Sequence, residues 1–314
     1  MLSDQKKPEI SGLIPVYKPL GMTSKDVSRA LVRRYGKIKI GHVGTLDPDA
    51  DGVLPILVGR GTKLQDYLLS MNKAYKFELT LGTATDSMDA TGKVVAECPW
   101  DHVTQEKIKA ILPEFLGTIT QIPPIYSAVK YKGKELYKYA HAGKTADDLP
   151  LKDLQRQVHI SELMIDYINL PKIGFTVHCS KGTYVRTLSC DLAEALETIG
   201  HVTRLTRILS AGFDLEGCIS LERATDQNST LESITVPMDR LSIGLPTWIP
   251  NDMVSLQRLV DGQHVVMEAM QFPLRVTGSH HDVLAKSSDG KSVGIVDVMS
   301  LEGDRVKLHM KRGL

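Results

Sequence analysis

A fourteen-residue stretch, residues 41–54, combines three glycines, a proline, a histidine and three aspartates directly before an apolar run. Its glycines can adopt backbone angles that are closed to other residues, and Pro48 restricts the backbone of Asp47, which precedes it. A loop of this composition directs a side chain through its backbone rather than through packing. The stretch is therefore expected to present a carboxylate for chemistry.

Three carboxylates in one loop could also bind calcium. Asp47, Asp49 and Asp51 precede a glycine, which matches the opening of an EF-hand loop. The twelfth position of such a loop carries a bidentate glutamate, but here it is Val58. Residues 53–58 also read as a short buried strand that contains a proline, not as an exiting helix. The sequence therefore argues against calcium, and we expect no metal.

Charge is concentrated locally rather than over the whole chain. The 314 residues carry a formal net charge of only +1, which neither requires a nucleic-acid partner nor excludes one. Residues 18–42, however, hold seven basic side chains against one acid, Asp26. The basic residues are Lys18, Lys25, Arg29, Arg33, Arg34, Lys37 and Lys39. This basic stretch leads directly into the carboxylate loop.

The cysteines and the first residues indicate a cellular compartment. The four cysteines are far apart and form no C-x-x-C pair, so reduced thiols are expected rather than a zinc ribbon or a redox dithiol. Residues 1–7 lack the apolar region of a signal peptide, and no apolar run approaches the roughly 20 residues that span a bilayer. We expect a soluble, cytoplasmic protein with no membrane partner.

Hydrophobic patterning predicts an α+β protein. The main expected strands are 12–17, 75–81, 156–168, 173–180 and 202–209, and the main expected helices are 23–36, 104–116 and 183–199, with a shorter helix capped by Thr62. In the second of these strands, Tyr75 to Leu81 alternate with polar residues, which is typical of a half-buried antiparallel strand. Because strands and helices do not alternate regularly, a mixed, mainly antiparallel sheet is expected.

The chain is expected to change character near residue 246. Proline, tryptophan and turn residues mark a joint at 246–250, and short apolar segments follow at 265–267, 293–298 and 306–310. Two domains are therefore predicted, a larger one over 1–245 and a small β-rich one over 246–314.

Five stretches, in this order, resemble the motifs of the TruB family of tRNA pseudouridine synthases. They are Val16–Ser24, Gly41–Pro55, Gly82–Gly92, Gln121–Ala128 and Cys179–Arg186. The resemblance covers roughly the first 245 residues. It implies a pseudouridine synthase catalytic domain with an RNA-clasping insertion at about 124–152, and a PUA-like RNA-binding domain at 246–314.

The resemblance also implies an activity. Relatives isomerise uridine 55 in the T loop of tRNA to pseudouridine, without a cofactor and without an obligatory protein partner. The expected partner is the T-arm stem-loop of tRNA, and a monomer is the natural default. Two alternatives remain open, a tRNA-folding chaperone that uses the same surface and a subunit of a guide-RNA-dependent pseudouridine synthase.

The reaction requires an ionised carboxylate near the sugar or the base. Asp47 fits as nucleophile or base, and Arg186 fits as the cation that keeps a buried aspartate ionised. Lys18 is expected to support the site.

Further roles follow from the resemblance alone. It implies that Tyr75 stacks on the uracil and is a candidate to relay a proton, that Tyr184 lines the pocket, and that Leu205 closes its far side. In relatives, the histidine that corresponds to His42 occupies the space vacated in the tRNA loop.

The sequence departs from the family pattern at three positions. His141 stands where relatives commonly carry arginine, and Asp49 and Asp51 replace residues that are usually uncharged or hydroxylic. Extra acid beside Asp47 would disfavour phosphate and raise the pKa of Asp47. Asp49 and Asp51 are therefore expected to point to solvent.

Overall fold

The computed structural model describes residues 10–268, 272, 281–301 and 304–314. Residues 1–7, on which the expectation about a signal peptide rests, lie outside this range. Among the described residues, no helix combines the length and the apolar character needed to cross a bilayer.

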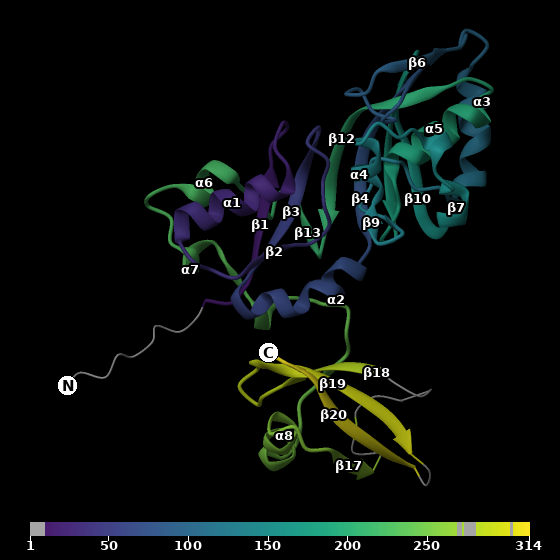
Figure 1. Ribbon diagram of the computed structural model, residues 1–314. Coiled ribbons are helices and arrows are strands. Elements are labelled where there is room, and N and C mark those ends of the chain that lie inside the picture. The colour runs from purple at the N-terminus through teal and green to yellow at the C-terminus, as the bar shows by residue number, and fades with distance from the viewer. Residues whose placement is uncertain (1–9, 269–271, 273–280, 302–303) are drawn as a thin grey trace.

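An eleven-stranded sheet forms the larger part of the molecule (Figure 1). Its main path runs β14 (Ile219–Ser220), β1 (Gly12–Lys18), β3 (Ala50–Val58), β12 (Gly200–Ser210), β4 (Lys73–Leu81), β11 (Lys172–Cys179), β10 (Arg156–Asn169) and β7 (Gly117–Gln121). Three short strands join it at the side, β2 (Ile40–His42), β13 (Phe213–Asp214) and β15 (Val236–Pro237). Only the pairs β1–β14 and β3–β12 are parallel within this sheet of described strands. The predicted mixed, mainly antiparallel sheet is confirmed.

Helices cover one face of this sheet at two separate places. α1 (Ser24–Tyr35) lies over β1 and β3, while α5 (Val185–Ala195) and α3 (Gln105–Ile111) lie over the other half (Figure 1). Val27 of α1 and Leu188 of α5 are fully buried in the same apolar cluster. α1 begins and ends where the sequence predicts, because Thr23 and Asp26 form a capping box and the chain turns at Gly36 with φ 82°.

Strand β4 alternates as predicted, but its polar face is more buried than expected. Phe77 and Leu79 point into the core, and Glu78 on the opposite face is only 8% exposed. Glu78 is buried because it accepts hydrogen bonds from Lys172, Thr203 and Tyr167 of neighbouring strands. The prediction of a half-buried strand was therefore wrong at Glu78.

Three predicted helices are shorter or differ in kind. The helix expected over 183–199 is α5, which begins at Val185 and ends at Ala195. Residues after β3 form a 3₁₀ helix, η1 (Gly59–Leu64), followed by α2 (Gln65–Ser70). The hydroxyl of Thr62 donates to the carbonyl of Gly59 inside η1, so Thr62 does not cap an α-helix. α3 gives way to η2 (Leu112–Phe115), which contains Pro113 in its first turn.

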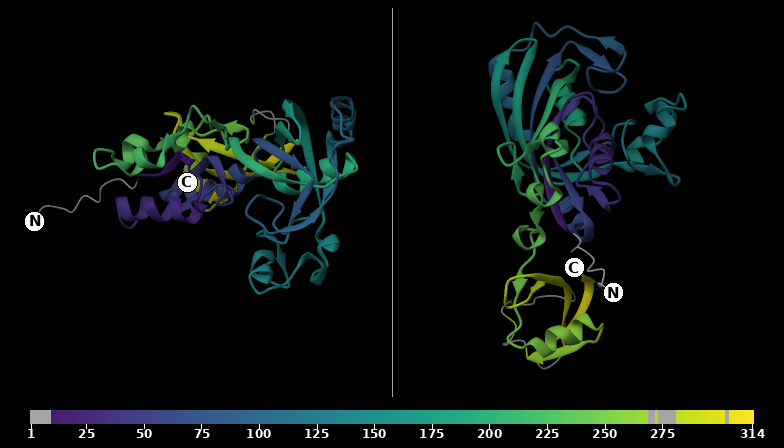
Figure 2. Two further views of the ribbon diagram at one scale, coloured as in Figure 1. Left: turned by 90° about the horizontal axis from the view of Figure 1, so that it is seen from above. Right: turned by 90° about the vertical axis from the view of Figure 1, so that its left-hand side faces the viewer.

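A segment of small elements projects from the body of the sheet (Figure 2). It contains β8 (Lys130–Tyr131), β9 (Lys134–Glu135), α4 (Leu136–Ala140), η3 (Ala146–Asp148) and η4 (Leu151–Leu154). Ile125, Leu136 and Leu151 form its own small buried cluster. The segment corresponds in position to the predicted insertion.

Connecting elements complete the larger part. A hairpin of β5 (Thr83–Thr85) and β6 (Val94–Glu97) follows β4, and α6 (Leu221–Thr225), α7 (Leu231–Ile234) and η5 (Met238–Arg240) follow β13 and β14.

The C-terminal residues form a separate five-stranded sheet below the larger one (Figure 1). Its order is β16 (Thr247–Trp248), β18 (His281–Lys286), β19 (Ser292–Leu301), β20 (Arg305–Gly313) and β17 (Val265–Glu268), with α8 (Met253–Val260) packed beside it. The three segments that the sequence predicts as strands, at 265–267, 293–298 and 306–310, lie in β17, β19 and β20.

The two sheets meet at η1 and α2. Leu64 and Leu68 pack with Leu314 in one buried cluster, and the hydroxyl of Tyr67 donates to the carboxylate of Asp282 at 2.8 Å. The C-terminal sheet thus rests on the segment that directly follows β3.

Candidate active site

The loop that carries Asp47 connects β2 to β3 and is fixed on both sides of Asp47. On one side, the hydroxyl of Ser24 accepts from the amide of Leu46 at 2.9 Å and donates to its carbonyl at 3.2 Å. On the other side, the carbonyl of Pro48 accepts from the amide of Gly21 at 2.8 Å. The position of Asp47 is therefore set by its backbone, as the composition of the loop indicates.

Lys18 supports the same loop through hydrogen bonds to backbone carbonyls. Its side chain is fully buried, and its ammonium donates to three backbone carbonyls, those of Pro19 (2.9 Å), Met22 (2.6 Å) and Pro48 (3.2 Å). Burial lowers the pKa of Lys18 to about 8, although the nearby carboxylates of Asp51, Asp49 and Asp47 oppose the shift. Lys18 thus binds the carbonyl of Pro48, the residue that follows Asp47.

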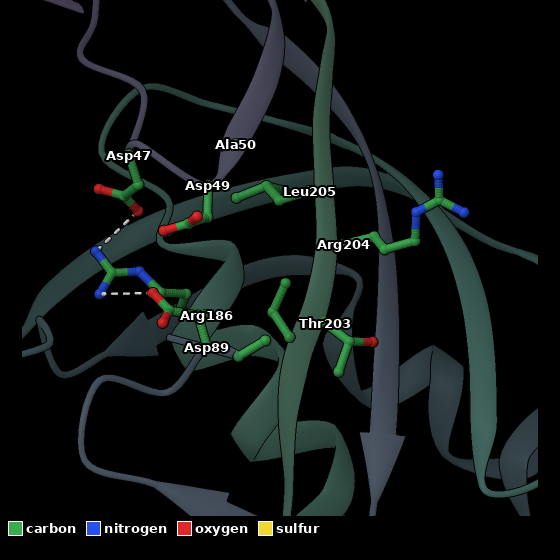
Figure 3. A pocket seen from close by; sticks show the side chains of 10 residues that line it. Asp47, Asp49, Ala50, Asp89, Arg186, Thr203, Arg204 and Leu205 are labelled. Carbon is green, nitrogen blue, oxygen red and sulfur yellow. Dashed lines mark ion pairs between the residues drawn. The ribbon is translucent and has the colours of Figure 1, made fainter. Parts of the chain in front are cut away.

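Asp47 forms an ion pair with Arg186. The Nη2 of Arg186 lies 3.0 Å from Oδ2 of Asp47. The same guanidinium donates to the carbonyls of Ser87 at 3.1 Å and Tyr126 at 2.8 Å, and its Nη1 lies 3.9 Å from a carboxylate oxygen of Asp89. Figure 3 shows Arg186 between the two carboxylates. The ion pair predicted from the sequence is therefore present, and Arg186 also joins two further segments to it.

The first turn of α5 positions Arg186. Tyr184 is the N-cap of this helix, and its side chain makes no capping hydrogen bond. Instead, the side chain of Gln121 accepts from the amide of Tyr184 at 2.9 Å and donates to its carbonyl at 3.2 Å. Because Gln121 is almost fully buried, it fixes the start of the helix that carries Arg186.

The surroundings of Asp47 have opposing effects on its charge. Burial raises the pKa of Asp47 above its ordinary value, Arg186 lowers it, and Asp89 raises it again. The side chain nevertheless keeps 39% of its surface exposed, while that of Arg186 keeps 6%. The pair therefore presents an accessible carboxylate that is backed by a buried cation.

A pocket opens beside this pair on the helix-covered face of the sheet (Figure 3). It is lined by Asp47, Asp49, Ala50, Asp89, Ala90, Arg186, Val202, Thr203, Arg204 and Leu205. Ala50 and Leu205 are neighbours in the parallel pairing of β3 with β12 and supply an apolar wall. The side chain of Arg204 points away from the two aspartates that pair with Arg186 (Figure 3). The pocket thus combines an apolar wall with a carboxylate and its cation.

Three other predicted site residues do not line this pocket. Tyr75 is only 9% exposed and packs in the core, and burial raises its pKa. Tyr184 is half-buried, with the guanidinium of Arg156 over its ring at 5.5 Å. His42 lies at the end of β2, and its Nε2 is 3.4 Å from the hydroxyl of Thr45. Burial lowers the pKa of His42.

Asp49 and Asp51 behave differently from one another. Asp49 is exposed, as expected, and it lies at the pocket. Asp51 does not point to solvent: its Oδ2 accepts from the hydroxyl of Tyr17 at 2.5 Å, and its Oδ1 is buried without a hydrogen-bond partner among the described residues. The expectation for Asp51 was wrong because β3 begins at Ala50 rather than Val53, so Asp51 is already inside the sheet.

Asp89 was not singled out as a site residue from the sequence. Its Oδ1 accepts from the hydroxyls of Ser87 and Thr91, both at 2.6 Å, which fixes the carboxylate in the turn between β5 and β6. The signal available in the sequence was its place in the stretch 82–92, where a carboxylate follows a serine in a turn.

The projecting segment combines aromatic and basic side chains. The ammonium of Lys134 lies 4.8 Å from the centre of the Tyr139 ring, and Lys132 lies 5.2 Å from that of Tyr131. His141 is exposed and makes edge contacts with two tyrosine rings. These cations are exposed on a segment that also contacts Arg186 through the carbonyl of Tyr126.

Comparison with known proteins gives one family. Residues 32–185 match the N-terminal domain of the TruB family of pseudouridylate synthases. The chain is 38% identical over 299 residues to tRNA pseudouridine synthase B of Caldanaerobacter subterraneus subsp. tengcongensis, covering 95% of this chain and 98% of that protein. It is 36% identical over 286 residues to tRNA pseudouridine synthase B of Bacillus subtilis, covering 88% of this chain and 90% of that protein.

Solved structures share the fold at lower sequence identity. A chain of a Cbf5-Nop10-Gar1 complex superposes with a TM-score of 0.73 and 22% identity, covering 96% of this chain and 84% of that chain.

Proposed function

The chain belongs to the TruB family of pseudouridylate synthases, and we propose that it isomerises uridine 55 in the T loop of tRNA to pseudouridine. The relatives that cover most of its length carry the name tRNA pseudouridine synthase B, so an isomerase acting on tRNA is the activity to assign. We further propose that the T arm is the part of tRNA that is bound and that the reaction uses no cofactor.

The observation that carries the proposal is the ion pair of Asp47 and Arg186 at the pocket. Three carboxylates and two arginines line the pocket; Arg186 is already paired with two of the carboxylates, and the side chain of Arg204 points away from these two. Such a charge balance disfavours phosphate and suits an uncharged base that enters along the apolar wall. A uracil must leave its stack to reach this depth, which costs a few kcal/mol.

The main chemical group that the reaction requires is one carboxylate in a fixed position. The bond between N1 of uracil and C1′ of ribose breaks, the uracil turns, and C5 binds C1′. The hydrogen on C5 leaves and N1 gains one, so no atom is added and nothing is oxidised or reduced. Asp47 acts as nucleophile or base, and Arg186 keeps it ionised. No cofactor is required for this balance.

The remaining predicted residues surround the reaction. We assign Leu205 to the far side of the uracil. Neither tyrosine lines the pocket of the free protein, so Tyr75 is assigned to stacking and proton relay, and Tyr184 to the pocket lining, once the uracil is bound. Stacking on an aromatic ring is worth about 1–3 kcal/mol, which offsets much of the cost of flipping the base. Because Tyr75 is 9% exposed, this assignment requires the uracil to reach the edge of the core. His42 fills the space that the flipped nucleotide leaves.

RNA binding is assigned to three regions. The basic stretch 18–42 and the projecting segment at about 124–152 contact phosphates and bases, and residues 246–314 form a PUA-like RNA-binding domain. The exposed cations and half-buried tyrosines of the projecting segment support its part. A division of the chain at 245/246 lies between η5 and β16. We propose a monomer that requires no protein partner.

The test uses purified full-length protein and an unmodified T-arm stem-loop, with no guide RNA, metal or cofactor added. We expect pseudouridine at the target uridine, detected by nucleoside chromatography, and none when the same stem-loop carries cytidine there. Absence of product with the wild-type protein would exclude a stand-alone synthase. Product that persists in Asp47→Asn would exclude the catalytic assignment.

A tRNA chaperone would use the same surface, and the same variant separates the two activities. Asp47→Asn should lose modification and keep tRNA refolding, measured by recovery of aminoacylation of a misfolded transcript. Loss of both by one conservative substitution would show that binding, not only chemistry, depends on Asp47.

A further inference from the structure

Arg207 is a buried cation beneath the active-site loop that the proposed reaction leaves unused. It lies on β12, opposite Gly52 of β3 and Tyr75 of β4. Its residue surface is only 1% exposed. Within the described part of the chain, no carboxylate lies within 4.0 Å of its guanidinium to form an ion pair. A buried charge without an acidic partner is costly unless other groups satisfy its donors.

Backbone carbonyls from both ends of the loop accept hydrogen bonds from this guanidinium, and the side chain of Tyr75 also hydrogen-bonds with it. The Nε of Arg207 donates to the carbonyl of Val53 at 2.7 Å, and its Nη2 donates to the carbonyl of Gly44 at 3.0 Å. Asp47 lies between these two positions in the chain. One guanidinium therefore fixes the separation between the start and the end of the segment that carries Asp47.

Two glycines allow Arg207 to come this close. Gly44 has φ +75°, and a Cβ added there would lie 3.1 Å from Nη1 of Arg207. Gly52 has φ +103°, and a Cβ there would lie 2.2 Å from the carbonyl oxygen of Arg207. The two glycines of the loop are thus matched to one arginine on the neighbouring strand.

We propose that Arg207 is a positioning residue for the reaction, which holds the loop so that Asp47 meets Arg186. The planar guanidinium can reach two carbonyls in fixed directions at once, which a lysine ammonium on a flexible stem does not reproduce. The expected effect of Arg207 on the reaction rate rests on the proposed function. The effect of Arg207 on the conformation of the loop does not depend on catalysis.

A matched control lies next to Arg207. Lys73 is 6% exposed, and its ammonium also donates only to carbonyls among the described residues, those of Leu69 and Met71 at the end of α2. Lys73→Met removes a buried cation of similar burial while keeping an apolar stem beside Gly44. It therefore measures the cost of losing a buried cation that lies beside Gly44 and Arg207 but whose hydrogen bonds go to Leu69 and Met71 rather than to the Asp47 loop.

The test compares Arg207→Lys, Arg207→Met and Lys73→Met with the wild-type protein. Amide hydrogen exchange is measured at Val43, Leu46 and Ala50, whose amides are hydrogen-bonded within or beside the loop. Single-turnover formation of pseudouridine and binding of the T-arm stem-loop are measured from pH 5 to pH 9. If Arg207→Met does not fold, Arg207→Lys carries the comparison.

In Arg207→Lys we expect loop amides to exchange at least about tenfold faster, with the amides of β11 unchanged. We expect the single-turnover rate to fall about 100-fold, as a misplacement of about 1 Å can cause. RNA binding should stay within about twofold, and the acid limb of the rate profile should move to higher pH because Asp47 is less well paired. Lys73→Met should show neither the exchange change nor the shift of the acid limb.

The proposal is overturned if Arg207→Lys leaves loop exchange unchanged, or if Lys73→Met reproduces its exchange and pH effects. A loss confined to RNA binding would also overturn it. If the wild-type protein forms no pseudouridine, the proposed function fails, and loop exchange alone then decides the role of Arg207.

Discussion

Two carboxylates, Asp47 in the loop between β2 and β3 and Glu78 in β4, are each paired with a cation, and they differ in almost every other respect. Oδ2 of Asp47 lies 3.0 Å from Arg186, and Oε1 of Glu78 lies 2.8 Å from Lys172. At the pocket the acid is the exposed partner, with side-chain exposures of 39% for Asp47 and 6% for Arg186. At Glu78 the order is reversed, with 10% for the acid and 50% for Lys172.

The different surroundings shift the pKa values of Glu78 and Asp47 in opposite directions. Burial would raise the pKa of Glu78, but hydrogen bonds from Lys172, Thr203 and Tyr167 outweigh it and lower the pKa to about 2. At Asp47, burial outweighs Arg186, so the pKa is raised. A carboxylate whose oxygens are saturated with donors stabilises the fold. A carboxylate such as that of Asp47, which has one close cation and is partly exposed, keeps oxygen lone pairs available for a substrate.

Neutralising each acid in turn tests this difference most directly. Asp47→Asn should lower the single-turnover rate of pseudouridine formation by at least about 1,000-fold, because the reacting group is removed. Glu78→Gln should change that rate by less than about threefold. Comparable losses in the two variants would mean that the distinction between the two carboxylates has no functional meaning.

Arg186→Lys tests whether the buried cation sets the charge of Asp47. We expect a loss of about 100-fold at neutral pH, since an ammonium cannot keep the contacts of the guanidinium with Asp47, Ser87 and Tyr126. Activity requires ionised Asp47 and is lost as pH falls through its pKa. A weaker cation raises that pKa further, so the acid limb should move to higher pH in a rate profile.

The neighbouring acid should act in the opposite direction on the pH profile. Asp89 raises the pKa of Asp47, so Asp89→Asn should move the acid limb to lower pH. It should also reduce the rate about tenfold, equivalent to about 1.4 kcal/mol, because Arg186 loses a charged partner. Asp86→Asn, an exposed acid of the same turn, serves as the control and should change neither quantity.

The effect expected at Glu78 is on stability and not on the reaction rate. Glu78→Gln should lower the free energy of unfolding by about 1–3 kcal/mol at pH 7, because charged hydrogen bonds are lost. Since the pKa of Glu78 is lowered from 4.5 to about 2, its contribution is complete above pH 4.5 and is lost as pH falls towards 2. Urea denaturation at pH 7 and pH 3 should therefore show a smaller difference from wild type at pH 3. Glu162→Gln, in an exposed pair with His178, should cost less than about 0.5 kcal/mol.

The sequence predicts the elements that local patterning determines. Strands 156–168, 173–180 and 202–209 correspond to β10, β11 and β12, and the helix that begins after Thr23 ends at Gly36. The pairing of Asp47 with Arg186 was also predicted, because the chemistry requires a cation and the motif that resembles the family supplies one.

Contacts between distant residues could not be predicted in the same way. Glu78 receives its hydrogen bonds from Lys172 and Thr203, which lie 94 and 125 residues away in the chain. Arg207 stands in a strand among polar and apolar neighbours, and nothing in its local pattern indicates that its donors reach Gly44 and Val53. Asp51 was misassigned because the start of β3 depends on pairing with β12.

One hydrogen bond joins the projecting segment, which we propose contacts the RNA, to the ion pair of Asp47 and Arg186. The carbonyl of Tyr126, at the root of the projecting segment, accepts from the same nitrogen of Arg186 that pairs with Asp47. Any displacement of that root removes a contact that holds the guanidinium in place. An RNA that displaces the projecting segment would therefore meet an Asp47 that is poorly paired with Arg186. Such an RNA would react more slowly than the correct substrate even where it binds.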